Sequence, residues 1–95
     1  MGEYMEINEI RSKIDKVNDE LLSLLLERLS LSREVAEYKI NNNLPIYDKK
    51  REEEIINALT YKCKDNAEYI IPVFDAILDT SKKLQEDIIS EKEGR

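Results

Sequence analysis

Histidine is absent from this 95-residue sequence, which also holds only one cysteine, two glycines and two prolines. Without histidine, the chain lacks the most common general base and metal ligand, and every histidine-dependent catalytic triad is excluded. The single cysteine, Cys63, cannot form an internal disulfide. Glycine and proline are too rare for a turn-rich β fold. We therefore expect an all-α protein with no metal site and no cofactor.

The charge balance restricts the function further. Hydrophobic residues make up 41% and charged residues 38% of the chain, which is typical of a soluble helical protein rather than a disordered one. The net charge of −6 argues against nucleic-acid binding, because contacts with phosphates need a basic surface. No early apolar run resembles a signal peptide, and no apolar stretch is long enough to cross a bilayer. We expect a cytoplasmic protein that binds neither nucleic acid nor membranes.

Residues 7–40 contain neither glycine nor proline and predict one very long helix, with Asn8 as a possible N-cap and a frayed segment 1–5 before it. At 1.5 Å per residue this helix measures roughly 50 Å, which is too long for a compact monomer of this size. Its apolar residues alternate in spacing between three and four, so they form one stripe of the helix. The stripe consists of Ile7, Ile10, Ile14, Val17, Leu21, Leu24, Leu31 and Val35.

Arg28 interrupts this stripe between Leu24 and Leu31, and Ser32 and Lys39 continue the same face. A charge on a buried seam is costly unless another group pairs with it. Three interpretations are open. The side chain can reach water along the core surface, form an ion pair with another helix, or belong to an anion site inside a helical core.

A second helix is predicted over residues 48–62, after the asparagines at 41–43 end the first. Acidic residues crowd its first turns, which suits the helix dipole. Asp48, Arg51 and Glu52 lie at i, i+3 and i+4, and therefore on one face. They could bind a ligand, or they could be helix-start charges and an ordinary surface pair.

A third helix is predicted over residues 67–89, with Pro72 expected to kink or restart it and a charged tail after it. Ser81 and, one turn on, Gln85 occupy positions where its apolar seam should continue. They either face solvent or contribute polar groups to a site. Together the three helices predict a single domain, residues 1–95. A domain this small buries only a modest fraction of its surface, so association of two chains is a natural way to bury more.

Three segments of this sequence resemble the all-helical chorismate mutases: IRSKIDKVNDELLSLLLERLSLSREVAEYK, PIYDKKREEEII and LDTSKKLQ. The resemblance covers residues 7–89. It implies three helices per chain in an intertwined homodimer, and an isomerase that rearranges chorismate to prephenate in the shikimate pathway of aromatic amino acid biosynthesis. It also implies a site made of Arg11, Arg28, Lys39, Asp48, Arg51, Glu52, Ser81 and Gln85.

The resemblance further implies a role for each of these residues. Arg28, with Arg11 of the partner subunit and Ser81, would hold the carboxylates of chorismate. Lys39 and Gln85 would donate hydrogen bonds to the ether oxygen. The ring hydroxyl would be received by Glu52 with the backbone around Asp48, supported by Arg51.

The spacing of the two arginines supports a shared site. Arg11 and Arg28 are 17 positions apart, which is roughly 25 Å along one helix. They also point about 100° apart around the helix axis. One small molecule cannot be bound by both from the same chain, so if both line a site, Arg11 comes from the partner.

Two other functions are compatible with the sequence. An isochorismate-pyruvate lyase shares the fold, although Asp48 and Glu52 favour the mutase because they suit a hydroxyl at the chorismate position. A non-catalytic helical regulatory or interaction module is the second alternative. The site has no obvious nucleophile, since Lys39 is the only candidate, through a Schiff base, and nothing in the sequence shows it desolvated.

Overall fold

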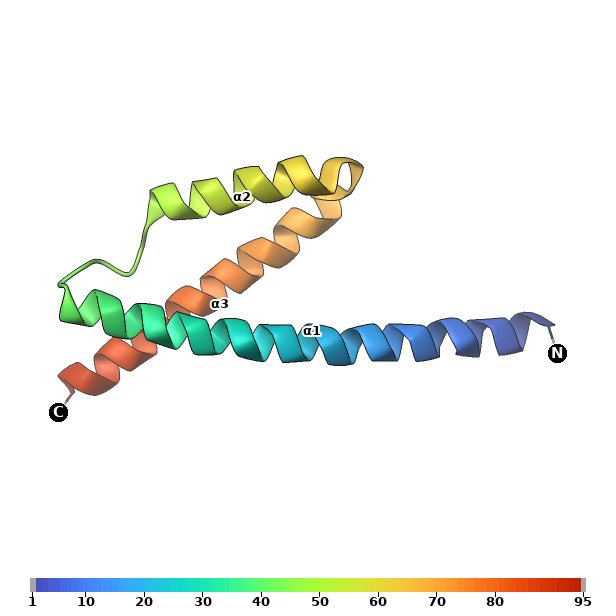
Figure 1. Ribbon diagram of the computed structural model, residues 1–95, viewed down its shortest axis with the longest axis horizontal. Helices are drawn as coiled ribbons and strands as arrows, with labels where there is room; N and C mark the ends of the chain where they lie inside the picture. Colours follow the sequence, from blue (N-terminus) through green and yellow to red (C-terminus); the bar gives the residue numbers. More distant parts are fainter. Residues whose placement is uncertain (1, 95) are drawn as a thin grey trace. The chain divides into compact units, whose positions relative to one another are not determined.

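The computed structural model describes residues 2–94, and the side chains of residues 6–94. Helix α1 spans Gly2–Asn41, α2 spans Lys49–Cys63, the short 3-10 helix η1 spans Lys64–Asn66, and α3 spans Ala67–Glu93 (Figure 1). No strand occurs between residues 2 and 94. The prediction of an all-α chain is therefore confirmed.

The chain divides into two compact units, Met1–Leu31 and Ser32–Arg95. The first unit is the N-terminal part of α1. The second contains the end of α1 together with α2, η1 and α3. That the whole chain acts as a single domain over residues 1–95 stays a prediction.

Helix α1 begins at Gly2, so the predictions of a start near Ile7 and of Asn8 as its N-cap are wrong. No proline interrupts the sequence between Gly2 and Ile7, so the backbone there is free to be helical. Met1 lies outside the described residues. At the other end, Asn43 adopts a positive φ of 54°, the left-handed conformation expected of an asparagine that follows a helix.

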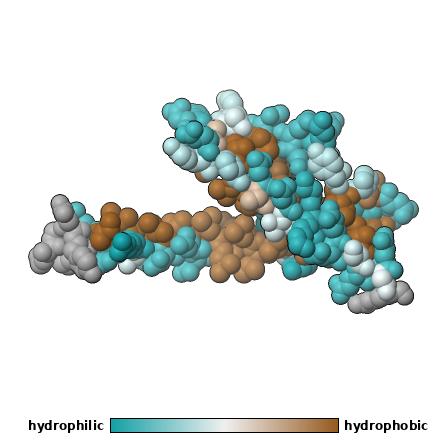
Figure 2. Space-filling model, turned by 180° about the vertical axis from the view of Figure 1, so that it is seen from behind, coloured by the Kyte–Doolittle hydropathy of each residue, from teal (hydrophilic) through white to brown (hydrophobic). Residues whose placement is uncertain are grey.

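The apolar stripe of α1 lies on the surface of the single chain. Ile10, Ile14 and Leu24 keep 52%, 51% and 61% of their surface exposed, and brown, apolar surface follows the N-terminal half of α1 in Figure 2. Soluble monomers rarely expose an apolar surface of this extent without a partner for it. The first unit therefore has a face that is suited to contact with another protein surface.

Asp48 fixes the start of α2. Its carboxylate accepts a hydrogen bond from the backbone N–H of Arg51 at 3.0 Å, which makes it the N-cap of a helix that begins at Lys49. This side-chain acceptor satisfies one of the donors that a helix N-terminus leaves without an intrahelical partner. The linker between α1 and α2 is thereby joined to a well-defined first turn.

Helix α3 differs from its prediction in two ways. It continues through Pro72, so the predicted restart is wrong, whereas a kink at that position stays a prediction. It also includes residues 90–93, which were expected to form a charged tail. There the ammonium group of Lys92 contacts the carboxylate of Glu37 at 2.7 Å, which attaches the last turns of α3 to the end of α1.

The most buried side chains of the second unit are largely polar. Ala36 and Leu78 are buried apolar residues, and Ser32, Ser81 and Gln85 are buried beside them. Buried hydroxyl and amide groups are costly unless they are hydrogen-bonded. A cluster of them in so small a core points to a functional role.

Candidate functional site

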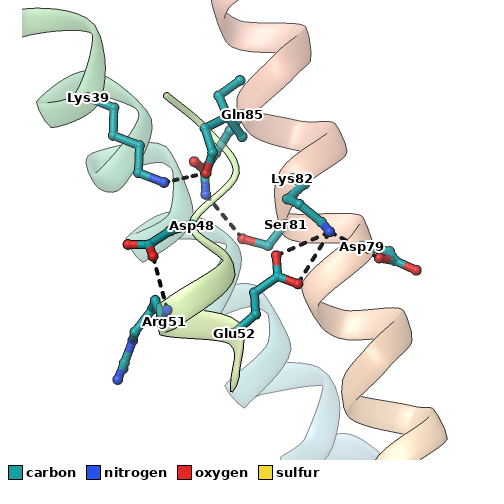
Figure 3. A network of polar contacts seen from close by, with 9 residues as sticks. Lys39, Asp48, Arg51, Glu52, Asp79, Ser81, Lys82 and Gln85 are labelled. Carbon is teal, nitrogen blue, oxygen red and sulfur yellow. Dashed lines mark hydrogen bonds and ion pairs between the residues drawn. The ribbon is translucent and has the colours of Figure 1, made fainter. Parts of the chain in front are cut away.

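Ser81 and Gln85 on α3 face the interior of the second unit, so the interpretation in which they face solvent is wrong. The hydroxyl groups of Ser32 and Ser81 share a hydrogen bond of 2.7 Å between α1 and α3. The amide Nε2 of Gln85 donates to the Ser81 hydroxyl at 3.3 Å (Figure 3). These three residues form a continuous polar chain, which we call the polar cluster.

Gln85 has an unused acceptor in this arrangement. Its Oε1 is buried and accepts no hydrogen bond from any residue that the structure describes. A buried acceptor without a donor costs free energy, so such groups are rare in folded proteins. Half a turn of the amide would let Ser81 donate to Oε1 and would leave Nε2 as a free donor. The amide thus always has one group available for a ligand.

Lys39 provides a cation on the α1 side. Its ammonium group donates to the backbone carbonyl of Ile46 in the linker at 2.6 Å, and its side chain is half-buried. Figure 3 shows the side chains of Lys39 and Gln85 extending from their helices toward the same region. An ammonium group has three N–H donors, so one hydrogen bond to Ile46 leaves two for a ligand.

The first turn of α2 supplies the carboxylates. Asp48 is exposed and caps the helix. The guanidinium of Arg51 is exposed and lies 3.9 Å from the carboxylate of Glu54, as in an ordinary surface pair. Glu52 is different, because its side chain is only 23% exposed and points toward α3. Ligand-binding roles for Asp48, Arg51 and Glu52 stay predictions.

Lys82, on α3, is the charged residue that sequence reasoning missed. Its ammonium group lies 3.1 Å from Oε2 of Glu52 and 3.5 Å from Oδ1 of Asp79. It also lies 4.8 Å from the centre of the Tyr47 ring, a cation–π contact with the linker. The hydrogen bond with Glu52 is the main cause that raises the pKa of Lys82 above its ordinary value, against a smaller opposing effect of burial.

The signal for Lys82 was present in the sequence but easy to overlook. Lys82 follows Ser81 directly and precedes Gln85 by three positions, so it lies on the edge of the polar face of α3. It is followed by Lys83, and a pair of lysines on a helix is normally a solvated surface feature.

Arg11 and Arg28 both belong to the first unit, where Arg11 is exposed and Arg28 is half-buried. The six other predicted site residues belong to the second unit. That the arginines converge with them stays a prediction. Arg11 and Arg28 do lie on one continuous helix, so the separation of roughly 25 Å derived from the helical rise applies.

A cavity of about 230 Å³ is lined by the end of α1, the residues that follow it and the end of α3. Among the predicted site residues it includes Lys39 alone, so we do not assign the ligand site to it. It is lined by Lys39, Ile40, Asn43, Leu44, Ile89, Lys92 and Glu93.

The described part of the chain lacks the features of a metal centre and of a membrane span. It holds no group of three or more cysteine, aspartate or glutamate side chains that could bind a metal ion. None of its helices combines the length and the apolar character needed to span a membrane.

The fold and the polar cluster define an all-helical protein with hydrogen-bonding groups in its core. The family model of chorismate mutase type II matches residues 10–86. A chorismate mutase of Methanocaldococcus jannaschii is 34% identical over 93 residues, which cover 95% of this chain and 94% of that protein. The chain therefore belongs to the type II chorismate mutase family.

Other relatives are longer proteins. The bifunctional chorismate mutase/prephenate dehydratase of Escherichia coli (strain K12) is 31% identical over 85 residues, which cover 86% of this chain but 22% of that protein. A secreted chorismate mutase of Yersinia pestis is 38% identical over 65 residues, which cover 65% of this chain and 35% of that protein. This chain thus corresponds to one part of each of these two proteins.

Proposed function

We propose that this protein is a chorismate mutase that rearranges chorismate to prephenate in aromatic amino acid biosynthesis. Family membership and the likeness to the Methanocaldococcus jannaschii enzyme over almost the whole chain support the assignment. The structural observation that carries it is the buried amide of Gln85, which has one group without a partner among the described residues and extends toward the same region as Lys39.

The chemistry suits a chain without histidine. The rearrangement takes place within one molecule and needs no proton transfer, nucleophile or metal ion. The enzyme has to hold a flexible dianion in its compact reactive conformation. It also has to stabilise the negative charge that grows on the ether oxygen as the carbon–oxygen bond breaks.

Lys39 and Gln85 are the donors for that oxygen in this proposal. Lys39 has two ammonium protons left after its bond to Ile46. Gln85 offers Nε2 once its amide turns and accepts from Ser81, and Ser32 then keeps the Ser81 hydroxyl in place. Two donors fixed before the reaction starts stabilise developing charge without reorganisation during it.

The remaining residues bind the ends of the substrate. Arg28 and Arg11 of the partner subunit hold the carboxylates, with Ser81 in support. Glu52, with the backbone around Asp48, receives the ring hydroxyl, and Arg51 supports this group from the first turn of α2. An acidic protein can bind a dianion in this way when its cations are concentrated in the site.

The proposed assembly is an intertwined homodimer. The exposed stripe of α1 supplies an apolar surface to bury, and the separation of Arg11 from Arg28 makes a site incomplete within one chain. Sedimentation at micromolar concentration should give a dimer, and a stable folded monomer would contradict the assembly. The cytoplasmic location stays a prediction, since one relative is named a secreted chorismate mutase.

The function is tested by adding purified protein to chorismate and identifying the product. We expect chorismate to disappear and prephenate to form. Release of pyruvate when isochorismate is supplied in a parallel assay would instead indicate the lyase. No turnover of either compound would indicate a non-catalytic interaction module.

A further inference from the structure

The ammonium group of Lys82 connects three segments beside the polar cluster. It contacts Glu52 of α2 through both carboxylate oxygens, at 3.1 Å and 3.4 Å. It contacts Asp79 one turn earlier on α3 at 3.5 Å, and it lies over the ring of Tyr47 in the linker. Glu52 is therefore held from a neighbouring helix and does not extend freely into solvent (Figure 3).

This ion pair differs from the surface pairs of the same helix. The side chains of Lys82 and Glu52 are 27% and 23% exposed. The adjacent Lys83 pairs with Asp87 on the same helix, and those two side chains are 75% and 63% exposed. Exposed ion pairs contribute little to stability because water screens the two charges. A charged hydrogen bond that is partly removed from water holds its two partners more firmly.

We propose that Lys82 is a positioning residue of the chorismate site, which holds the Glu52 carboxylate in the orientation that receives the ring hydroxyl. The proposal rests on the proposed function. A carboxylate accepts about four hydrogen bonds, so Glu52 can bind Lys82 and still accept one from the substrate. Tyr47 limits the position of the ammonium group from the linker side, and Asp79, whose side chain is 77% exposed, is a secondary contact.

The alternative is that Lys82 only joins α2 to α3 and contributes to stability. The two roles predict different kinetics. Positioning of a group that binds the substrate equally in the ground state and the transition state acts mainly on KM. A stability role alone leaves the kinetic constants of the folded fraction unchanged.

The first test compares Lys82→Met with the matched control Lys83→Met, which removes the neighbouring lysine and its exposed ion pair. For Lys82→Met we expect kcat/KM for chorismate to fall by about tenfold, mainly through KM, as for loss of one charge-assisted hydrogen bond. Lys83→Met should stay within about twofold of wild type. Lys82→Arg keeps the charge and should recover part of the loss. If Lys82→Met does not fold, Lys82→Gln carries the same expectation.

The second test is a double-mutant cycle with Glu52→Gln. If Lys82 acts through Glu52, then adding Lys82→Met to Glu52→Gln should change kcat/KM by less than about twofold, because the group that Lys82 positions is already lost. An equal, multiplicative loss in both backgrounds would overturn the positioning role. Urea unfolding of each variant separates effects on stability from these kinetic effects.

The two proposals fail in different ways. An active wild type in which Lys82→Met and Lys83→Met have equal kcat/KM would overturn the role of Lys82 alone. A folded wild type that leaves chorismate unchanged would overturn the proposed function and this inference with it.

Discussion

Gln85 carries two hydrogen-bonding groups, and within the described residues only one of them has a partner. Ser81 and Ser32 bind the amide at one end through a chain of hydroxyl groups whose hydrogen atoms can rotate. The unsatisfied group raises the free energy of the ligand-free protein. Once the amide turns so that Ser81 donates to Oε1, the free group is the donor Nε2, and a ligand with an acceptor oxygen at that point removes the cost.

Substitution of Gln85 tests whether the amide acts in the transition state. We expect Gln85→Ala to lower kcat by ~10²-fold, by analogy with loss of one oxyanion-hole donor. Gln85→Glu should gain activity as pH falls toward ~4.3, the ordinary pKa of glutamate, because its carboxyl group donates only when protonated. The measurement is the pH–rate profile of a variant shown to be folded. A wild-type profile, together with full activity of Gln85→Ala, would remove Gln85 from the reacting centre.

Substitution of Lys39 should reduce kcat more than substitution of Gln85. Lys39→Ala removes a charge as well as a donor, so its loss of kcat should exceed that of Gln85→Ala. Lys39→Arg should recover only part of the activity, because a planar guanidinium places its donors differently. Steady-state kinetics of the three variants decide this order. Full activity of Lys39→Arg would mean that charge alone is required.

The helices differ in how clearly the sequence marks their ends. Helix α2 begins directly after Asp48, within the predicted range, because an aspartate followed by acidic residues is a specific start signal. Helix α1 has no comparable signal. Asn8 is of a residue type that often caps helices, but it lies inside α1. Pro72 interrupts the sequence pattern but not the helix, which continues on both sides of it.

The asparagine run and the polar seam of α3 were predictable from residue type and spacing. The contacts between helices were not. The bond between Ser32 and Ser81 and the pair of Lys82 with Glu52 join residues 49 and 30 positions apart. Such pairs depend on how two helices pack against each other, and one amphipathic pattern does not determine its partner. Lys82 was missed for this reason, and Ser32 was placed on the polar face of the first helix but without its partner Ser81.

The capping role of Asp48 is testable apart from catalysis. Asp48→Ala should reduce the free energy of unfolding by ~1 kcal/mol, because the N–H of Arg51 loses its acceptor. Asp48→Asn is the matched control, since it keeps a side-chain oxygen and should stay close to wild type. Urea unfolding at several protein concentrations measures both. Equal stability of all three proteins would show that the cap contributes nothing.

For the molecule as a whole, the main question is whether one site is built from two chains. Arg11→Ala and Arg28→Ala should each abolish activity alone. When the two variants are mixed and allowed to exchange chains, each mixed dimer contains one site with both lesions and one with neither, so activity should return. The assay is chorismate consumption before and after exchange. Demonstrated exchange without recovery would show that Arg11 does not act across the interface.

The exposed stripe of α1 also affects how the protein reaches its native state. Within one chain these side chains remain in contact with water, so in the proposed dimer they are covered only after a second chain arrives. That step is bimolecular, and its half-time lengthens as the protein is diluted. Folding and assembly then become one concentration-dependent process. A newly made chain would have to meet a second copy before its catalytic site exists.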